Sequence, residues 1–355
     1  MTTRIGWYVH HHGRGHLTRL QAIAPHLEAS GVGIHCFSSF PAPDPLPPGC
    51  VWTTLPRDDD PYPNGRSPGE ADPTAAGLLH WAPLGHPGHR ARLTAIATEV
   101  ARRPVDAFVV DVSVEITLLV RLLGIAPVVI AQPGRRDDEP HRLGLQSAHT
   151  IIAPWPHDIL APAYLEPFAA KVRHTGGISR FAERATRRTD AVTDRDAAAA
   201  MDATRRVDDV ALLAGGGGVS LSADEVAAAA AATGRPWQVL GGTHGVWADD
   251  PWPALTGAAA VVSWAGQNSV ADLAAAHAPA VLLPQPRPFD EQHEMAATLR
   301  RAGLAVVVDE WPGAAQWPAL LDRAMAAEDR WDLWQVPGAA ARAADVILAT
   351  ADRSR

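Results

Sequence analysis

Short apolar runs alternate with amphipathic segments along most of the chain. The first apolar run, 5–9, leads into a polar loop rich in histidine and glycine. A helical pattern of apolar residues follows, contains Pro25 and stops at Gly31, so we expect a helix that is kinked at the proline. This order of strand, loop and helix is typical of one unit of an α/β fold.

The same alternation continues to the end of the chain. In the first half it predicts strands at 33–38, 105–110, 127–131 and 150–153, and a helix at 114–123. In the second half it predicts strands at 210–214, 237–240, 259–263, 280–283 and 305–308. Helices are expected after the capping box at 222–225 and at 269–277 and 291–302. Strands that alternate with helices form parallel sheets, so we expect two doubly wound units.

The chain length of 355 residues also favours two domains, at roughly 150 residues each. We expect a Rossmann-like domain at 1–180, a second one at 207–335 and a final helix at 336–355 that could pack back on the first domain. The segment 181–206 is charged and poor in large apolar residues, as linkers are. Residues 40–90 are rich in Pro, Gly and Asp, which predicts an irregular segment that is either functional or disordered.

Composition excludes several classes of protein. A formal charge of -8 makes nucleic acid a poor partner. Lys171 is the single lysine, so the chain has no G-K-[ST] phosphate loop. With two cysteines, no secretory leader pattern and no apolar run near the ~18 residues of a membrane span, the chain is expected to be cytoplasmic.

The loop after the first strand contains Gly15 and His16 at a predicted helix start. Glycine there lets backbone amides approach an anion or a polar substrate closely. A nicotinamide fingerprint would need glycine at Thr18, and the second strand would end in an acidic residue, so a hydride-transfer enzyme is not expected. His16 is either a polar residue at the helix start or a general base.

A metal site was the other hypothesis for this loop, because three histidines, 10–12, precede His16. Their spacing matches no zinc signature, so we expect no metal here. The acidic run 58–60 is not spaced to bridge a metal and a phosphate.

Asp111 ends a predicted strand, at the sheet edge where ligands bind, and Glu115 follows one turn later. Asp111 could instead cap the following helix, although Ser113 could also serve as that cap.

The most specific local pattern is the polar turn after the strand at 259–263. Gly266, Gln267, Asn268 and Ser269 would present amides and hydroxyls to a diphosphate. Asp272 could accept hydrogen bonds from two ribose hydroxyls or simply stabilise the helix dipole. Glu291 and Gln292 could hold sugar hydroxyls or cap their helix.

These residues resemble a known family. Gly266, Asn268, Ser269 and Asp272 match the core H-C-G-W-N-S-x-x-E of the signature of nucleotide-sugar glycosyltransferases with the GT-B fold, and Glu291-Gln292 match its downstream acidic-Gln pair. Continued through Ala276, Pro279 and Pro284, the stretch is similar to the MurG-like glycosyltransferase family 28. Gly15-His16 resembles the family's N-terminal G-H, and the run Gly215, Gly216, Gly217 and Gly218 its C-domain glycine loop. The chain departs at Trp264, where the plant-type signature has histidine, and at Met295, where the family has asparagine.

The resemblance implies a GT-B fold: two Rossmann-like doubly wound domains that face each other across a cleft. It also implies an inverting, metal-independent transferase that moves a sugar from a nucleoside diphosphate donor, UDP-linked, to an acceptor hydroxyl without a cofactor. In that role His16 would be the base and Asp111 its orienting partner. The acceptor could be a small molecule or lipid-linked, which leaves a peripheral membrane contact open.

Two alternatives stay open at this point. A UDP-N-acetylglucosamine 2-epimerase shares the fold and the donor, and a sugar-nucleotide-binding protein without catalysis would also fit. The apolar segment 80–84 within the irregular region is either an acceptor-docking element or a packed loop anchor.

Overall fold

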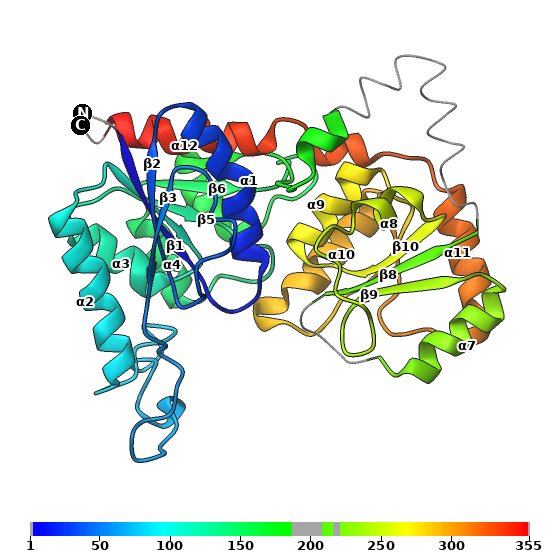
Figure 1. Cartoon of the computed structure of the whole chain (residues 1–355), viewed down its shortest axis with the longest axis horizontal. Coiled ribbons are helices and arrows are strands. Elements are labelled where there is room, and N and C mark those ends of the chain that lie inside the picture. The colour runs from blue at the N-terminus through cyan, green and yellow to red at the C-terminus, as the bar shows by residue number, and fades with distance from the viewer. Residues whose placement is uncertain (1–2, 187–207, 216–220, 354–355) are drawn as a thin grey trace.

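The computed structural model describes residues 3–186, 208–215 and 221–353, which form two α/β domains side by side (Figure 1). The N-terminal sheet has seven parallel strands in the order β3-β2-β1-β4-β5-β6-β7. They are β1 (Arg4–Val9), β2 (Gly33–Ser38), β3 (Cys50–Thr54), β4 (Ala107–Asp111), β5 (Pro127–Ile130), β6 (Thr150–Ala153) and β7 (Val172–His174). The predicted fold class is confirmed.

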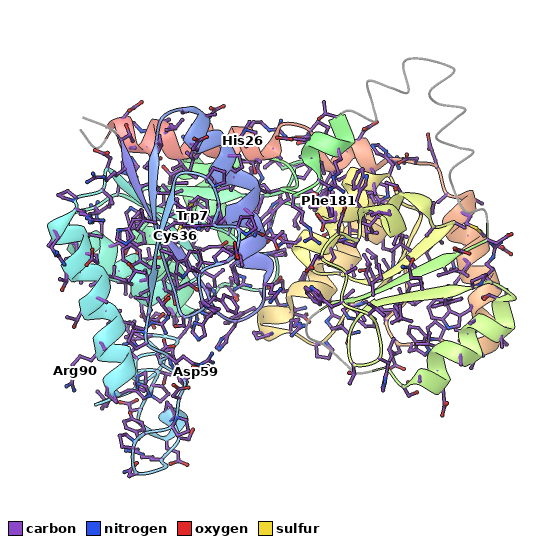
Figure 2. The ribbon with its side chains drawn as sticks, viewed as in Figure 1. Trp7, His26, Cys36, Asp59, Arg90 and Phe181 are labelled. Atoms are coloured by element: carbon purple, nitrogen blue, oxygen red, sulfur yellow. The ribbon has the colours of Figure 1, made fainter. Side chains whose placement is uncertain are left out.

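The helices of this domain are α1 (Gly15–Ala29), α2 (Pro87–Arg102), α3 (Val114–Leu122) and α4 (Glu139–Ser147). Pro25 lies inside α1, which continues to Ala29. Trp7 of β1 and Cys36 of β2 are fully buried in the core between sheet and helices (Figure 2). The segment between β3 and α2 projects from the body of the domain (Figure 1).

The C-terminal sheet has five parallel strands in the order β12-β11-β10-β8-β9. They are β8 (Val210–Gly215), β9 (Trp237–Gly241), β10 (Ala260–Trp264), β11 (Ala280–Leu283) and β12 (Val306–Val307). Its helices are α7 (Ala223–Thr233), α8 (Trp252–Gly257), α9 (Gln267–Ala276), α10 (Glu291–Arg301) and α11 (Trp317–Ala326). The predicted capping box opens α7, with Ser222 Oγ accepting from the Glu225 amide at 3.2 Å and the Glu225 carboxylate accepting from the Ser222 amide at 2.8 Å.

The structure also contains short 3₁₀ helices: η1 (Pro68–Glu70), η2 (Ala163–Lys171), η3 (Pro288–Asp290), η4 (Ala314–Gln316) and η5 (Trp331–Trp334). The region 40–90, expected to be irregular, therefore contains β3 and η1 and the start of α2. Of the expected linker, only residues 181–186 are described. None of the described helices is both long and apolar enough to cross a bilayer.

The last helix, α12 (Ala339–Arg353), leaves the C-terminal domain and lies along α1 of the N-terminal one (Figure 1). Ala343 and Ile347 of α12 are fully buried in one cluster with Leu20 and Ile23 of α1. Small alanine side chains let the two helices approach closely, so the chain's end is part of the first domain's core.

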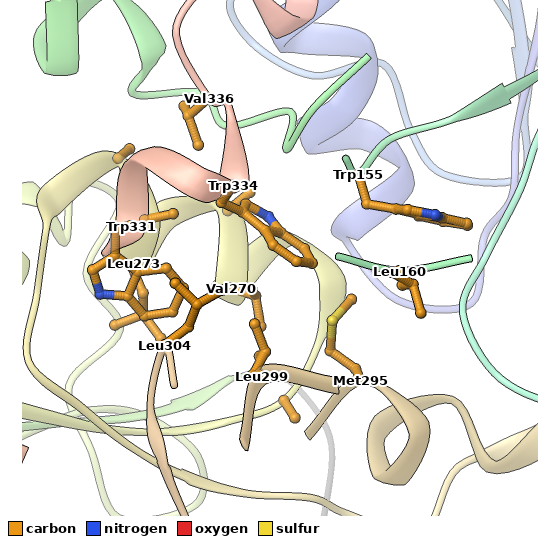
Figure 3. Close-up of a cluster of buried hydrophobic side chains, with 14 of the residues drawn as sticks. Trp155, Leu160, Val270, Leu273, Met295, Leu299, Leu304, Trp331, Trp334 and Val336 are labelled. Carbon is orange, nitrogen blue, oxygen red and sulfur yellow. The ribbon is translucent and has the colours of Figure 1, made fainter. Parts of the chain in front are cut away.

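A second buried cluster joins the two domains (Figure 3). Trp155 and Leu160 follow β6 in the N-terminal domain, and they share the cluster with Met295 of α10 and Trp334 of η5. Trp155, Met295 and Trp334 are 0% exposed. This packing fixes the loops of the two domains that face each other.

Candidate active site

His16 and Asp111 meet at the carboxyl edge of the N-terminal sheet. Val9 at the end of β1 pairs in register with Asp111 at the end of β4, so the loop after β1 passes directly over that carboxylate. His16, the second residue of α1, places Nδ1 3.0 Å from Asp111 Oδ1 although 95 positions separate them. Asp111 is fully buried, whereas the His16 side chain is 16% exposed. We call this pair the dyad.

Arg19 is a third residue that contacts the dyad, and it was not among the residues predicted from the sequence. Its Nη1 donates to Asp111 Oδ1 at 2.5 Å and to Oδ2 at 2.7 Å. Burial by itself opposes ionisation of Asp111, but the Arg19 guanidinium and the His16 imidazole outweigh it and hold the pKa of the carboxyl below its usual value. Asp111 therefore stays a carboxylate that can orient His16 through Nδ1. An arginine three residues after His16 lies on the same helix face, which was the available signal.

The same arginine reaches across to the C-terminal domain. Arg19 Nη2 donates to Gln267 Oε1 at 2.6 Å, and Asn268 Nδ2 donates to the Gly15 carbonyl at 2.7 Å. A Cβ added at Gly15 would lie 3.0 Å from Asn268 Nδ2, so glycine allows this close approach. The predicted diphosphate loop thus contacts the first turn of α1, beside the dyad.

The loop itself caps α9 with Gly266, which has no side chain to accept hydrogen bonds from the first-turn amides. A Cβ at Gly266 would lie 3.7 Å from Gln292 Nε2 and 3.9 Å from Ser269 Oγ, so these predicted residues are brought together. Gln292 Oε1 also accepts from the Gln285 amide at 2.9 Å. The amides of a helix start without a side-chain cap, and the polar side chains around them, favour an anionic ligand.

Asp272 lies one turn further along α9 and is 8% exposed. Ser179, in the segment that leads out of the N-terminal domain, donates its hydroxyl to Asp272 Oδ1 at 2.6 Å, and Arg180 Nε lies 3.7 Å from Oδ2. Burial raises the pKa of Asp272 to about 6, against the lowering effects of Ser179 and Arg180. Asp272, the residue predicted to bind the ribose, therefore also contacts the segment that connects the two domains.

Glu291 also has a partner in the facing domain, Arg136. Its Oε2 accepts from Arg136 Nη2 at 3.1 Å, and the Arg136 guanidinium lies over the Phe289 ring, 4.9 Å from the centroid. Gly134, with φ of 100°, allows this contact, because a Cβ there would lie 2.3 Å from the Phe289 carbonyl oxygen. Any sugar hydroxyl bound by Glu291 would share the carboxylate with Arg136.

The C-domain glycine run is described in part. Gly215 ends β8 beside Gly241 of β9. Gly216, Gly217 and Gly218 lie outside the described residues.

The two departures from the family signature have structural explanations. The Trp264 side chain is buried in the C-terminal core, where Nε1 donates to the Ala214 carbonyl at 2.5 Å, so it supports the strand that precedes the loop. Met295 belongs to the cluster shared by the domains. Both residues contribute to packing.

Glu115 is hydrogen-bonded to the backbone of the segment 80–84. Glu115 Oε1 accepts from the amides of His80 and Trp81 at 2.8 and 3.0 Å, and Trp81 Nε1 donates to the Asp58 carbonyl at 3.0 Å. These contacts hold the segment in place at His80 and Trp81, and Trp81 also lines a cavity of the N-terminal domain. The cap of α3 is Ser113, whose Oγ accepts from the Ile116 amide at 3.2 Å, which leaves Asp111 to the dyad.

A cavity of about 250 Å³, here called the N-terminal cavity, opens beside the histidine turn that precedes His16. Its lining includes Tyr8, His10, His11, Asp58, Trp81 and Arg92. The His10 ring centroid lies 5.6 Å from that of His16. Burial and the neighbouring imidazoles hold the pKa of His10 well below its usual value, and burial with Arg92 lowers that of His11 to about 4, so both rings are neutral at pH 7.

Comparison with known proteins bears on the fold and on the segment that contains the α9 loop. Residues 249–312 match the glycosyltransferase family 28 C-terminal domain, which includes the α9 loop and the start of α10. Three similar solved structures are MurG of Acinetobacter baumannii, the calicheamicin glycosyltransferase CalG4, and UGT2 of Phytolacca americana solved with UDP-2-fluoro-glucose and pterostilbene.

Sequence identity to these three proteins is low, at 16%, 16% and 12%, and the TM-scores are 0.60, 0.63 and 0.61. The matches cover 98%, 99% and 99% of this chain and 100%, 99% and 95% of the other chains. No curated protein sequence matches the chain significantly. The chain therefore shares the overall fold of these solved structures, and its residues 249–312 match the family 28 C-terminal domain.

Proposed function

We propose that the protein is an inverting glycosyltransferase that moves a sugar from a nucleoside diphosphate donor, UDP-linked, to an acceptor hydroxyl. The observation that carries the proposal is the dyad, whose 3.0 Å contact lies beside a glycine-capped helix start on the facing domain. A base next to an anion site is what transfer from a diphosphate sugar needs.

In the proposed step the acceptor oxygen attacks the anomeric carbon from the face opposite the diphosphate. The carbon–oxygen bond to the diphosphate breaks, and the acceptor proton passes to His16 Nε2. Asp111 holds Nδ1 and stabilises the imidazolium that forms, which together contribute about 10²-fold to 10⁴-fold. The diphosphate leaves toward the first-turn amides of α9, which carry its charge without a metal ion.

The donor would be held by residues of the C-terminal domain. Gly266, Gln267, Asn268 and Ser269 would face the diphosphate, Asp272 the ribose, and Glu291 with Gln292 the sugar. Gly15 would contribute from the facing helix, and the run from Gly215 to Gly217 from the end of β8.

The acceptor would occupy the N-terminal cavity. Its volume of about 250 Å³ and its imidazole, carboxylate and guanidinium groups fit a small polar molecule with a hydroxyl near His16. A lipid-linked acceptor would need to extend from this cavity along the projecting segment.

Thermal shift with UDP, dTDP, GDP, ADP and their sugars tests the donor, because a ligand that binds the folded state raises its apparent stability. We expect the largest shift with the UDP series. If Asp272 accepts both ribose hydroxyls, UDP should bind more tightly than dTDP by roughly 1–3 kcal/mol. Asp272→Ala should erase that preference. Equal binding of UDP and dTDP by the unchanged protein would contradict the ribose assignment.

A UDP-sugar turnover assay with and without acceptors separates transfer from the alternatives. Transfer requires the acceptor. Nucleotide release without one would instead indicate an epimerase, and binding without turnover a protein that has lost catalysis.

A further inference from the structure

Two polar turns that are far apart in the sequence meet at the wall of the N-terminal cavity. One is the histidine turn after β1, and the other is the acidic turn 58–60 at the base of the projecting segment, where Figure 2 labels Asp59. His12 Nε2 lies 3.1 Å from Asp59 Oδ2, and His11 Nε2 lies 3.7 Å from the same oxygen. Asp58 Oδ1 is 3.6 Å from His11 Nε2.

These separations fit a shared metal ion. Nitrogen and oxygen ligands bind zinc at about 2.0–2.2 Å in a tetrahedron, which places neighbouring ligand atoms roughly 3.3–3.6 Å apart. The ligand atoms of His11, His12 and Asp59 all lie within 4.8 Å of one another. The distances to Asp59 Oδ2 are 3.1 Å from His12 Nε2 and 3.7 Å from His11 Nε2. A small adjustment of side chains would complete the first coordination sphere.

His11 supplies the independent observation. Its side chain is 2% exposed, and neither ring nitrogen has a hydrogen-bond partner among the described residues. The carboxylates at 3.6 and 3.7 Å are too distant for ordinary hydrogen bonds. A buried polar atom without a partner is uncommon in a native protein, and a bound cation would satisfy one of the two nitrogens.

The local charge is compatible with a cation. Three carboxylates, at 58–60, face two guanidiniums: Arg57 Nη2 lies 2.6 Å from Asp59 Oδ2, and Arg92 pairs with Asp58. Three negative and two positive charges leave one excess negative charge. Arg57 also donates Nε to Asp59 Oδ1 at 2.9 Å, which fixes the orientation of the carboxylate as outer-shell partners of metal ligands do.

A second cluster of His80, Asp138 and His141 serves as a contrast. There both His141 nitrogens are occupied, Nδ1 by Asp138 at 2.6 Å and Nε2 by the Arg136 guanidinium at 3.0 Å. Its imidazoles have partners already, and a guanidinium points at one of them. We therefore assign no metal to it.

We propose that His11, His12 and Asp59 bind a divalent transition-metal ion of the zinc type at the wall of the N-terminal cavity. Two imidazoles and one carboxylate suit zinc, and three protein ligands leave a fourth position for water or an oxygen of a bound molecule. Only the identification of that molecule as the acceptor rests on the proposed function. The expectation of no metal came from spacing within the histidine run, which could not include a ligand from a distant turn.

Calorimetric titration of the full chain with zinc chloride, without a histidine tag, tests the proposal. We expect one tight equivalent. His12→Ala and Asp59→Asn should weaken binding at least about tenfold, the lower end of what loss of an outer-shell partner alone costs. His12 is 63% exposed, so that variant should fold, and thermal unfolding checks that it does. His149→Ala, at an exposed histidine outside both clusters, is the matched control and should bind zinc like the unchanged protein.

No stoichiometric zinc binding, or equal affinity in folded His12→Ala, would overturn the metal site. UDP binding by the same preparations keeps the two proposals separate. For His12→Ala we expect zinc binding to be lost and UDP binding to stay intact. The residues that would bind zinc and the α9 loop lie in different domains.

Discussion

At the scale of single residues, the site depends on how a fully buried carboxylate stays charged. Asp111 is shielded from water, and Arg19 and His16 are the groups that stabilise its ionised form. His16 and Asp111 could be predicted because one follows a strand and the other ends one, both at the binding edge of a parallel sheet. Arg19 lies one turn after His16 on the same helix face, which was a local signal, but its contact with Gln267, 248 residues away, could not be predicted. Similarly, nothing in the local sequence reveals that Asp272 is paired with Ser179.

The first prediction concerns Arg19. Arg19→Met keeps most of the side-chain volume but leaves Asp111 with His16 alone, so the pKa of Asp111 should rise. Removing one partner of a buried ion pair costs about 3–5 kcal/mol of unfolding free energy. A merely structural role would not move the pH profile, whereas we expect the acidic limb of kcat/KM to shift to higher pH. An unchanged profile in a folded variant would contradict the role of Arg19 in holding the charge.

The second prediction concerns Asp272, whose pKa is about 6 in the folded protein and about 3.9 in an unfolded chain. An acid with a raised folded pKa contributes stability that is full below the unfolded value and is lost as pH rises through the folded one. Asp272→Asn, which cannot ionise, should therefore be more stable than the unchanged protein at pH 8, by up to roughly 3 kcal/mol, and gain little at pH 4. Urea unfolding at the two pH values measures this.

Asp250→Asn is its control. Asp250 is exposed and paired with Arg184. Partial burial alone would raise the pKa of Asp250, but the Arg184 guanidinium outweighs it and lowers that pKa. Its loss should reduce stability at pH 8, the opposite sign. If Asp272→Asn raises the free energy of unfolding equally at pH 4 and pH 8, the charge of Asp272 is not the cause of the gain.

At the scale of elements, two helix starts face each other across the cleft. α1 begins after Arg14 and α9 after Gly266, and neither N-cap residue makes a side-chain capping hydrogen bond. Their amides are the groups that we expect to neutralise a diphosphate. Both helices were predictable from their apolar spacing and the glycines before them.

Other elements were not predicted, for reasons visible in their residues. In α2 the buried positions are Arg92, Ile96 and Val100, and the arginine interrupts the apolar pattern that would have indicated a helix. β3 is an edge strand with Val51 half exposed, so it lacks the alternation of a buried strand. α11 differs, because Trp317, Leu320, Leu321 and Ala324 are buried at helical spacing, and it could have been predicted.

The third prediction follows from the helix starts. If they carry the diphosphate charge, adding magnesium or manganese to the EDTA-treated protein should not raise turnover. Activity lost in EDTA and restored by magnesium or manganese would contradict this mechanism. Restoration by zinc alone would assign the requirement to His11, His12 and Asp59.

At the scale of the whole molecule, the cleft is held by contacts that no single segment contains. The cluster around Trp155, Met295 and Trp334 joins three parts of the chain, and α12 returns to the first domain (Figures 1 and 3). The sequence predicted two domains and a last helix that could pack back. It could not predict the shared cluster, because pairing between distant apolar residues leaves no local pattern. Met295 therefore stood out only as a departure from a signature.

The fourth prediction concerns a close approach of the two domains at Gly134. Gly134→Ala would place a Cβ 2.3 Å from the Phe289 carbonyl oxygen, so the two loops must separate. Gly124→Ala is a matched control, since Gly124 also has a positive φ, 77° against 100°, but no atom lies within 4 Å of its added Cβ. Both variants should lose about 1–2 kcal/mol to backbone strain. Gly134→Ala alone should also weaken UDP binding in calorimetry, and equal UDP affinity in the two variants would show that the contact does not shape the donor site.

The most direct test of the central claim compares turnover and donor affinity in His16→Ala, Asp111→Ala and the double variant. With His16 as the base, we expect His16→Ala to lower kcat at least about 10²-fold while the UDP dissociation constant stays nearly unchanged. The double variant should lose little more than the worse single one, because the residues act as a unit. Additive losses would mean separate roles for the two residues. Full turnover by His16→Ala on the true acceptor would contradict the account at its centre.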